Sequence, residues 1–214
     1  MKNKSYLKQY EGRVSPKRLD TIDRVVNNRQ LDLTLVIENV HDAHNVGAIF
    51  RSADAVGIDE VQLLYTKESF PGLHPKVTAS GGKWVKQNRF SDPQELATNL
   101  KQRGYKIYTT HLAHDAVSIH DIDWTQPSAI VLGNEHRGVS SELTALADNN
   151  IVIPMFGMVE SLNVSVATAV ILFEASRQRI AADQYPNSEL DSEWVEKMTD
   201  DWVNINYKRH FSRD

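Results

Sequence analysis

Short apolar runs alternate with helical patterns along the chain, and this alternation limits the possible folds more than any other feature. The run Leu33–Glu38, LTLVIE, predicts a buried strand, and Val46–Val56 follows it with apolar residues at helical spacing. Strands that alternate with helices indicate an α/β fold with a mostly parallel sheet. The further predicted strands are Glu60–Tyr65, Val85–Phe90, Tyr105–Thr110, Ala129–Leu132 and Ile151–Pro154.

Helical patterns fill the remaining core segments and both ends of the chain. The further predicted helices are Pro16–Val26, Asp92–Arg103 with Gly104 as its terminating residue, Ser140–Ala147 and Val164–Ile180. We therefore expect an α/β domain over residues 31–182. A helical extension over 1–30 precedes it, and a second helical extension over 183–214 follows.

Composition favours a cytoplasmic protein. The 214 residues include no cysteine, which excludes disulfides and thiolate chemistry and suits a reducing compartment. The first ten residues, MKNKSYLKQY, have no apolar run after their charges, so we expect no signal peptide. No stretch approaches the roughly 20 apolar residues of a membrane helix.

The charge distribution leaves the partner open. A net charge of −4 argues mildly against a nucleic-acid partner. However, basic residues such as Lys8 and Arg13 gather near the N-terminus, whereas acidic residues gather over 189–201. The basic ends could form a phosphate-binding rim, or they could be solvated termini.

Three predicted strands end in polar or glycine-rich sequences. The first ends at Thr110, the second runs into Gly133–Gly138, and the third runs from Ile153 to Ser161-Leu162-Asn163. Ligands of open parallel sheets bind outside the carboxyl ends of the strands. Glycine allows close approach to the main chain, so we expect a cofactor held largely by main-chain groups.

Several familiar sites are not supported. Gly133–Gly138 lacks the spacing of a phosphate-binding loop, and no Gly-x-Gly-x-x-Gly follows a strand. The pairs His41 with His44 and His111 with His114 lack further ligands, so we expect no metal. No Gly-x-Ser-x-Gly elbow of a serine hydrolase is present.

Two residues of the first helical segment are candidates for function. Asn45 stands where we predict the N-cap of the helix, so capping is its plain structural role. Arg51 lies off the apolar stripe and close to Gly47 on the helical surface. There it is either a solvated charge or a group that can bind a phosphate in bidentate fashion.

Taken together, these segments resemble the three motifs of SpoU/TrmH-type methyltransferases of the SPOUT class. The matching stretches are NVGAIFRSAD at Asn45–Asp54, LGNEHRG at Leu132–Gly138, and IPM followed by SLNVSVA at Ile153–Ala167. The resemblance covers residues 31–179. Within the class, residues 53–57 and 153–179 look most like the tRNA (guanosine-18-2′-O)-methyltransferases. Ala43 departs from the pattern, because relatives often have proline there.

The resemblance implies a sheet whose C-terminal part is threaded into a deep trefoil knot, with S-adenosylmethionine held in that knot. It also implies a homodimer whose active site combines residues of both subunits, and tRNA as the partner. Matching cofactor-binding positions are Thr110, Gly133, Asn134, Ile153 and Leu162. Matching catalytic positions are Asn45, Arg51, Glu135, Ser161 and Asn163. Arg177 and Arg179 match residues linked to RNA handling, although cations also suit the last turn of a helix.

The implied reaction is in-line transfer of a methyl group to a ribose 2′-oxygen. Arginine is a poor free base because it is effectively always protonated. We therefore expect Arg51 to hold the adjacent phosphate and stabilise the developing alkoxide, while Asn45 fixes the loop that bears it. Glu135 would order either the cofactor loop or the dimer contact. Alternatives are the same chemistry on ribosomal RNA, a non-catalytic RNA-binding module, and, less favoured, a nucleotide-binding oxidoreductase.

Overall fold

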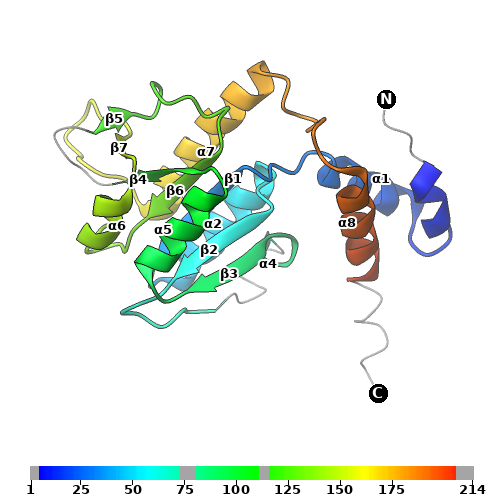
Figure 1. The fold of residues 1–214 in the computed structure, drawn as a ribbon, viewed down its shortest axis with the longest axis horizontal. Coiled ribbons are helices and arrows are strands. Elements are labelled where there is room, and N and C mark those ends of the chain that lie inside the picture. The colour runs from blue at the N-terminus through cyan, green and yellow to red at the C-terminus, as the bar shows by residue number, and fades with distance from the viewer. Residues whose placement is uncertain (1–4, 73–80, 111–115, 206–214) are drawn as a thin grey trace. The chain divides into compact units, whose positions relative to one another are not determined.

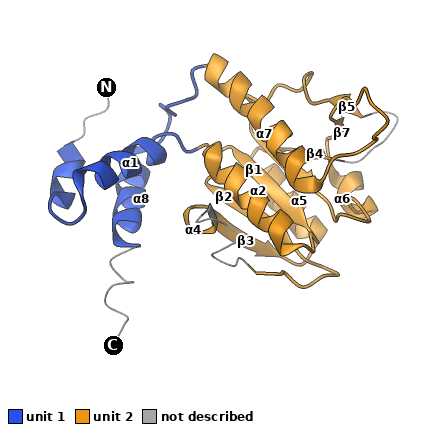
Figure 2. Ribbon diagram, turned by 180° about the vertical axis from the view of Figure 1, so that it is seen from behind, with its two compact units in different colours: residues 1–29, 183–214 blue, residues 30–182 orange. Residues whose placement is uncertain are grey.

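The computed structural model describes residues 5–72, 81–110 and 116–205. Its contacts divide the chain into two units, coloured separately in Figure 2. Residues 30–182 form the larger unit, and residues 1–29 join residues 183–214 in the smaller one. The sequence predicts two separate extensions, whereas the contacts of the two terminal segments group them in one unit. No described helix is long and apolar enough to cross a membrane.

The larger unit is built on a parallel sheet (Figure 1). Over the described residues the sheet has seven strands in the order β3-β2-β1-β6-β4-β7-β5, and every recorded strand pair is parallel. The predicted α/β class with a mostly parallel sheet is confirmed. The strands are β1 (Leu33–Glu38), β2 (Glu60–Leu64), β3 (Lys86–Phe90), β4 (Lys106–Thr109), β5 (Val117–Ser118), β6 (Ser128–Leu132) and β7 (Asn149–Val152).

Apolar sequence places β1 and β6 at the centre of the sheet. Every residue of both strands is buried, as continuous apolar runs in a parallel sheet predict. Strand β3 has the sequence KQNRF and forms an edge, where its polar side chains stay partly in solvent. The two-residue strand β5 was not predicted, because so short an element carries no periodic signal.

Helices cover both faces of this sheet. Helices α2 (Ala43–Ala55) and α7 (Val164–Ala181) pack on one face, and α5 (Pro93–Gln102) and α6 (Ser141–Leu146) lie on the other (Figures 1 and 2). The short helix α4 (Gly81–Trp84) lies beside α2. Side chains on the two faces of the sheet form separate apolar cores, and each helix turns its apolar side toward one of them.

Side chains that precede the helices fix where they begin. Asp42 accepts a hydrogen bond from the His44 N–H and is the N-cap of α2. The prediction that Asn45 caps this helix is therefore wrong, because the helix begins three residues earlier than its apolar pattern suggests. The predicted end of α5 is confirmed, since Gly104 follows the cap with a φ of +83°.

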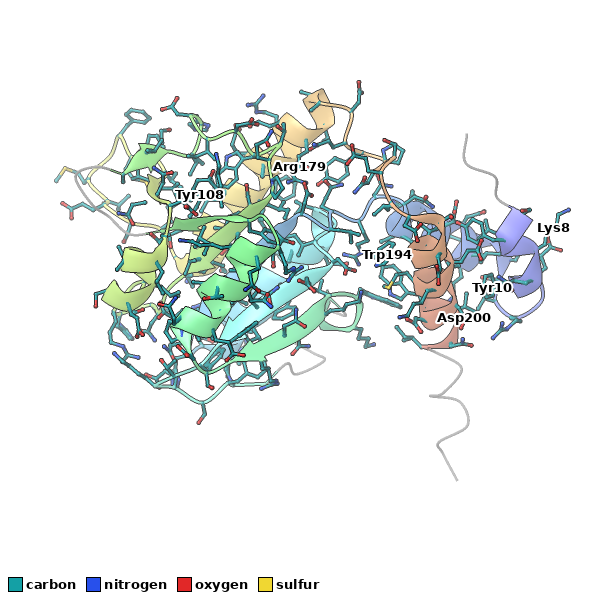
Figure 3. The ribbon with its side chains drawn as sticks, in the orientation of Figure 1. Lys8, Tyr10, Tyr108, Arg179, Trp194 and Asp200 are labelled. Atoms are coloured by element: carbon teal, nitrogen blue, oxygen red, sulfur yellow. The ribbon has the colours of Figure 1, made fainter. Side chains whose placement is uncertain are left out.

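The smaller unit contains the 3-10 helix η1 (Ser5–Tyr10), α1 (Pro16–Val26) and α8 (Ser192–Asn204). Figure 3 labels Tyr10 on the first of these and Asp200 on the last. The predicted bounds of α1 are confirmed. The Arg29 guanidinium lies 4.8 Å from the centre of the Trp202 ring, and the apolar faces of α1 and α8 are buried.

Candidate active site

A cavity of about 580 Å³ opens at the carboxyl edge of the sheet. Three loops and the start of α7 line it, namely those that follow β4, β6 and β7. Its size lies within the roughly 300–1,000 Å³ typical of small-molecule sites. The predicted site residues that line it are Thr110, Gly133, Asn134, Glu135, Ile153, Ser161, Leu162 and Asn163. The structure thus brings these three sequence-distant segments to one place.

The loop after β6 folds tightly back on itself. Asn134 and Gly138 exchange two main-chain hydrogen bonds of 3.0 and 2.8 Å, and Gly138 has a φ of +67°. A Cβ atom on Gly133 would collide with the main chain of Gly138 and Val139. Only glycine therefore fits at position 133 while the loop keeps this path.

A chain of hydrogen bonds joins the three motifs beside the cavity. The Asn45 Nδ2 donates to Glu135 at 2.9 Å, and the Asn163 Nδ2 donates to the Asn45 Oδ1 at 3.1 Å. The Glu135 carboxylate also accepts the main-chain N–H groups of His41 and Asp42. Glu135 therefore orders the segment that leads into α2 within its own chain. Asn45 links the two loops instead of capping the helix.

These donors keep Glu135 ionised. Burial by itself would raise the pKa of the Glu135 carboxyl, but the hydrogen bonds from Asn45 and from main-chain N–H groups outweigh it and lower the pKa below its usual value. A carboxylate that accepts several N–H groups is a fixed structural anion at neutral pH. Glu135 is consequently a poor proton acceptor for a substrate hydroxyl in this arrangement.

Asn163 also begins helix α7. Its Oδ1 accepts hydrogen bonds from the Ser165 N–H and hydroxyl at 2.9 and 2.6 Å, so Asn163 is the N-cap. Ser161 is exposed two residues earlier on the cavity wall. Thr110 also lines the cavity and donates its hydroxyl to the Val131 carbonyl. Asn163 thus combines a capping role with the link to Asn45.

Arg51 lies outside the cavity. It is exposed on α2, six residues after Asn45, and is absent from the cavity lining. Across the described part of the chain, its guanidinium has no hydrogen bond or ion pair. An uncompensated arginine on a helix surface is available to an external anion, and phosphate suits its geometry.

The arginines near the end of α7 differ from their predicted role. Arg179 is 1% exposed, and its guanidinium donates to the carbonyls of Trp124 and Gln126 and to the side chains of Gln30 and Asp32. The predicted RNA contact of Arg179 is therefore wrong, because no face of the guanidinium is left for a phosphate. Arg177 is exposed and pairs with Glu174 at 2.8 Å, so it remains accessible.

The predicted RNA-binding residues of the N-terminus lie in the smaller unit. Lys8 and Arg13 are both exposed, and Figure 3 labels Lys8 on η1. Arg13 donates to Asn204 at 2.8 Å and lies 3.9 Å from Asp200. Part of the acidic C-terminal stretch thus faces the basic N-terminal segment inside this unit.

The sequence patterns did not single out two buried polar residues at the end of β1. Glu38 is 2% exposed and accepts the Ser140 N–H at 2.8 Å. Asn39 has a φ of +51°, and its Oδ1 accepts the N–H groups of residues 66–68. The sequence did carry a signal for these two residues, because a charged residue at the end of an apolar strand, followed by asparagine, is unusual and indicates a specific polar role.

No candidate metal centre emerges from the side chains in the part of the chain that the structure describes. The described residues contain no group of three or more histidine, cysteine, aspartate or glutamate side chains placed to hold a metal ion. His41 and His44 flank the N-cap of α2 and are exposed. His111 and His114 lie outside the described residues.

Comparison with known proteins agrees with the motifs. Residues 32–173 match the SpoU rRNA Methylase family. The chain belongs to this family. It is 46% identical to a Thermus thermophilus tRNA (guanosine(18)-2′-O)-methyltransferase, over 85% of this chain and 93% of that protein.

Solved structures of relatives share the fold. The crystal structure of the Aquifex aeolicus TrmH/SpoU tRNA modifying enzyme has a TM-score of 0.82 and 37% identity, and covers 89% of this chain and 96% of that one. The SpoU methyltransferase AviRb of Streptomyces viridochromogenes, in complex with the cofactor AdoMet, has a TM-score of 0.64 and 29% identity over 71% of this chain and 62% of that one. This chain is therefore a methyltransferase of the SpoU family.

Proposed function

We propose that the protein transfers the methyl group of S-adenosylmethionine to the ribose 2′-hydroxyl of a guanosine in tRNA, at position 18 of the D-loop. The observation that carries the proposal is the single cavity shared by all three loops. The identity to the Thermus thermophilus enzyme over nearly its full length supports tRNA as the substrate. A cytoplasmic location follows from such a substrate, together with the absence of cysteine.

The cavity fits the donor by its size and by its main-chain lining. Thr110, Gly133, Asn134, Ile153 and Leu162 would hold it, and the tight loop at Gly133 brings main-chain groups to the cavity wall. When bound, the donor supplies a methyl group on a positively charged sulfur. The knotted path of the chain around these loops is part of the same proposal.

The chain's own residues then have to position the acceptor. Arg51 is free to bind the phosphate next to the target ribose and to stabilise negative charge on the 2′-oxygen. The hydrogen bonds that join Glu135 to Asn45 and Asn45 to Asn163 keep α2 and the donor loops in fixed register. Ser161, exposed on the cavity wall, is placed to orient the ribose.

A homodimer explains why Arg51 stands apart from the cavity of its own chain. Helix α7 presents Val166, Val170 and Phe173 to solvent at i, i+4 and i+7, and these residues form one stripe. Phe156 and Met158 are almost fully exposed in the loop before this helix. Apolar surface of this kind marks an interface, and a second copy on it would let Arg51 serve the cavity of the partner.

RNA contacts beyond the active site would come from Lys8, Arg13 and Arg177, all of which are exposed. Each phosphate contact adds to the salt dependence of binding. Arg179 is excluded from this set by its burial.

The test is site-mapped methylation of an unmodified tRNA transcript with labelled donor. We expect one 2′-O-methylguanosine in the D-loop, and a loss of at least about a hundredfold in rate for Arg51→Ala. Lys101→Ala, on α5 across the sheet from α2, is the matched control and should retain the wild-type rate. A label that appears in ribosomal RNA instead, or tRNA binding without transfer, would refute the proposal.

A further inference from the structure

Four residues form a closed ring of hydrogen bonds that includes the loop after β6. Asn134 donates from its Nδ2 to the Asn39 carbonyl at 2.7 Å, and the Asn39 Oδ1 accepts the Glu68 N–H at 3.2 Å. The Arg137 guanidinium donates to the Glu68 carboxylate at 2.5 Å. The Arg137 N–H returns to the Asn134 Oδ1 at 3.2 Å. The ring joins the ends of β1, β2 and β6.

Hydrogen bonds at Asn39 fix one side of this ring. Asn39 has a φ of +51°, in the left-handed region that asparagine enters more readily than most other non-glycine residues. Here the Asn39 Oδ1 accepts the main-chain N–H groups of Thr66, Lys67 and Glu68 together. The segment that carries Glu68 is therefore fixed relative to β1.

The Glu68–Arg137 pair is the one side-chain to side-chain link of the ring. Arg137 lies at the turn of the loop and lines the cavity, whereas Glu68 does not line it. The pairing with Arg137 lowers the pKa of the Glu68 carboxyl, so Glu68 is charged at neutral pH. His41 adds a weaker contact, with its Nδ1 4.0 Å from the Glu68 carboxylate. Arg137 thus receives its position from a residue outside the three motifs.

We propose that Glu68 is a positioning residue for the donor-binding loop and acts through Arg137. The proposal rests on the proposed function, because it assigns the cavity to the methyl donor. Without the pair, the turn at residues 135–137 would keep only the Asn134–Gly138 main-chain bonds and the contacts of the Asn134 and Glu135 side chains. A looser turn samples more conformations, and binding then costs more ordering.

A competing arrangement predicts the opposite result. If the Glu68 carboxylate merely occupied Arg137 until an anionic ligand group displaced it, removal of the Glu68 charge would strengthen ligand binding. If Glu68 positions the turn, its removal weakens binding. The sign of the change therefore decides between positioning and competition.

The experiment is calorimetric titration of the full chain with S-adenosylhomocysteine, the demethylated donor. We expect Glu68→Gln and Arg137→Gln each to raise the Kd about two- to fivefold, in keeping with a partly exposed ion pair. The double variant should lie no higher than the weaker-binding single variant, because both changes break the same link. For Glu68→Gln, which does not change the cavity lining, methyl transfer at saturating donor should stay within twofold of wild type, so that KM changes and kcat does not.

Glu60→Gln is the matched control. Glu60 forms a similar ion pair with Arg103 at 2.5 Å, near the start of β2 and away from the cavity, so this change should leave the Kd unaltered. Unchanged or tighter binding by Glu68→Gln, or additive effects in the double variant, would overturn the inference and leave the proposed function intact. Wild-type protein that binds no S-adenosylhomocysteine would overturn the proposed function itself.

Discussion

The two ends of the larger unit use polar side chains in opposite ways. At the carboxyl edge of the sheet, Asn163 begins α7 beside an open cavity, and its amide reaches Asn45. At the amino edge, Arg179 ends the same helix with its guanidinium buried among carbonyls and Asp32. The polar groups at the carboxyl edge are accessible to ligands, whereas those at the amino edge are buried and stabilise the fold. Substitutions at the two ends should therefore separate activity from stability.

The largest effect is expected at the buried end. Arg179→Ala would leave Asp32, Gln30 and two carbonyls without their donor. We expect a loss of about 3 kcal/mol in the free energy of unfolding, measured by urea denaturation. Arg177→Ala, two residues away on the exposed side, is the control and should unfold at nearly the wild-type urea concentration. A stable Arg179→Ala protein with weakened tRNA binding would contradict this assignment.

At the cavity end, Gly133→Ala tests the tight loop. The added Cβ atom would collide with the main chain of Gly138 and Val139, so the loop has to move. Overpacking of this kind costs about 1–3 kcal/mol. We expect the protein to fold with greatly weakened binding of S-adenosylhomocysteine, measured by calorimetry.

Gly157→Ala is the control for that change. It lies in the loop between β7 and α7, where an added Cβ would meet open space, so donor binding should persist. Donor binding of wild-type strength in Gly133→Ala would break the link between loop closure and the cavity.

Substitutions at Asn163 can separate its two roles, the N-cap of α7 and the hydrogen bond to Asn45. Asn163→Ala removes the N-cap of α7 and the link to Asn45, and should cost about 1 kcal/mol in stability together with most of the methyl-transfer rate. Asn163→Asp keeps the capping oxygen but loses the Nδ2 donor, so it should retain stability and lose activity. Asp92→Ala removes the cap of α5, none of whose residues lines the cavity, and should lower stability alone. Equal activity in Asn163→Asp and wild type would disprove the positioning role.

The smallest effect concerns pH at the buried end. Hydrogen bonds from Arg177, followed by those from Gln178, lower the pKa of Glu174 from 4.5 to about 2, against the opposing effect of burial. The ionised form is favoured by folding, so this stabilisation is present above pH 4.5 and is lost as the pH falls toward 2. Unfolding midpoints measured across this window should decline less in Glu174→Gln than in wild type. Parallel declines in the two proteins would show that Glu174 does not contribute.

Much of the fold could be predicted because buried elements need apolar residues, and these form recognisable patterns in the local sequence. Leu33–Glu38 is apolar at every position except its second and last, and it forms the predicted buried strand. Gly104 ends α5 as predicted because it adopts a conformation that other residues resist. The start of α2 was misplaced because its first turn is polar, and a polar turn carries no apolar period.

The sequence motifs were enough to predict most of the residues that line the candidate site. The second and third motifs carry the glycine, asparagine and serine positions that line the cavity, and Asn45 of the first motif is hydrogen-bonded to both. Tertiary structure alone decided what each charged side chain does. Arg177 and Arg179 are alike in sequence position, but only packing against residues 30–32 and 124–126 buries one of them. Glu68 gains its partner Arg137 in the same way, because long-range contacts between charges leave no periodic pattern in the chain.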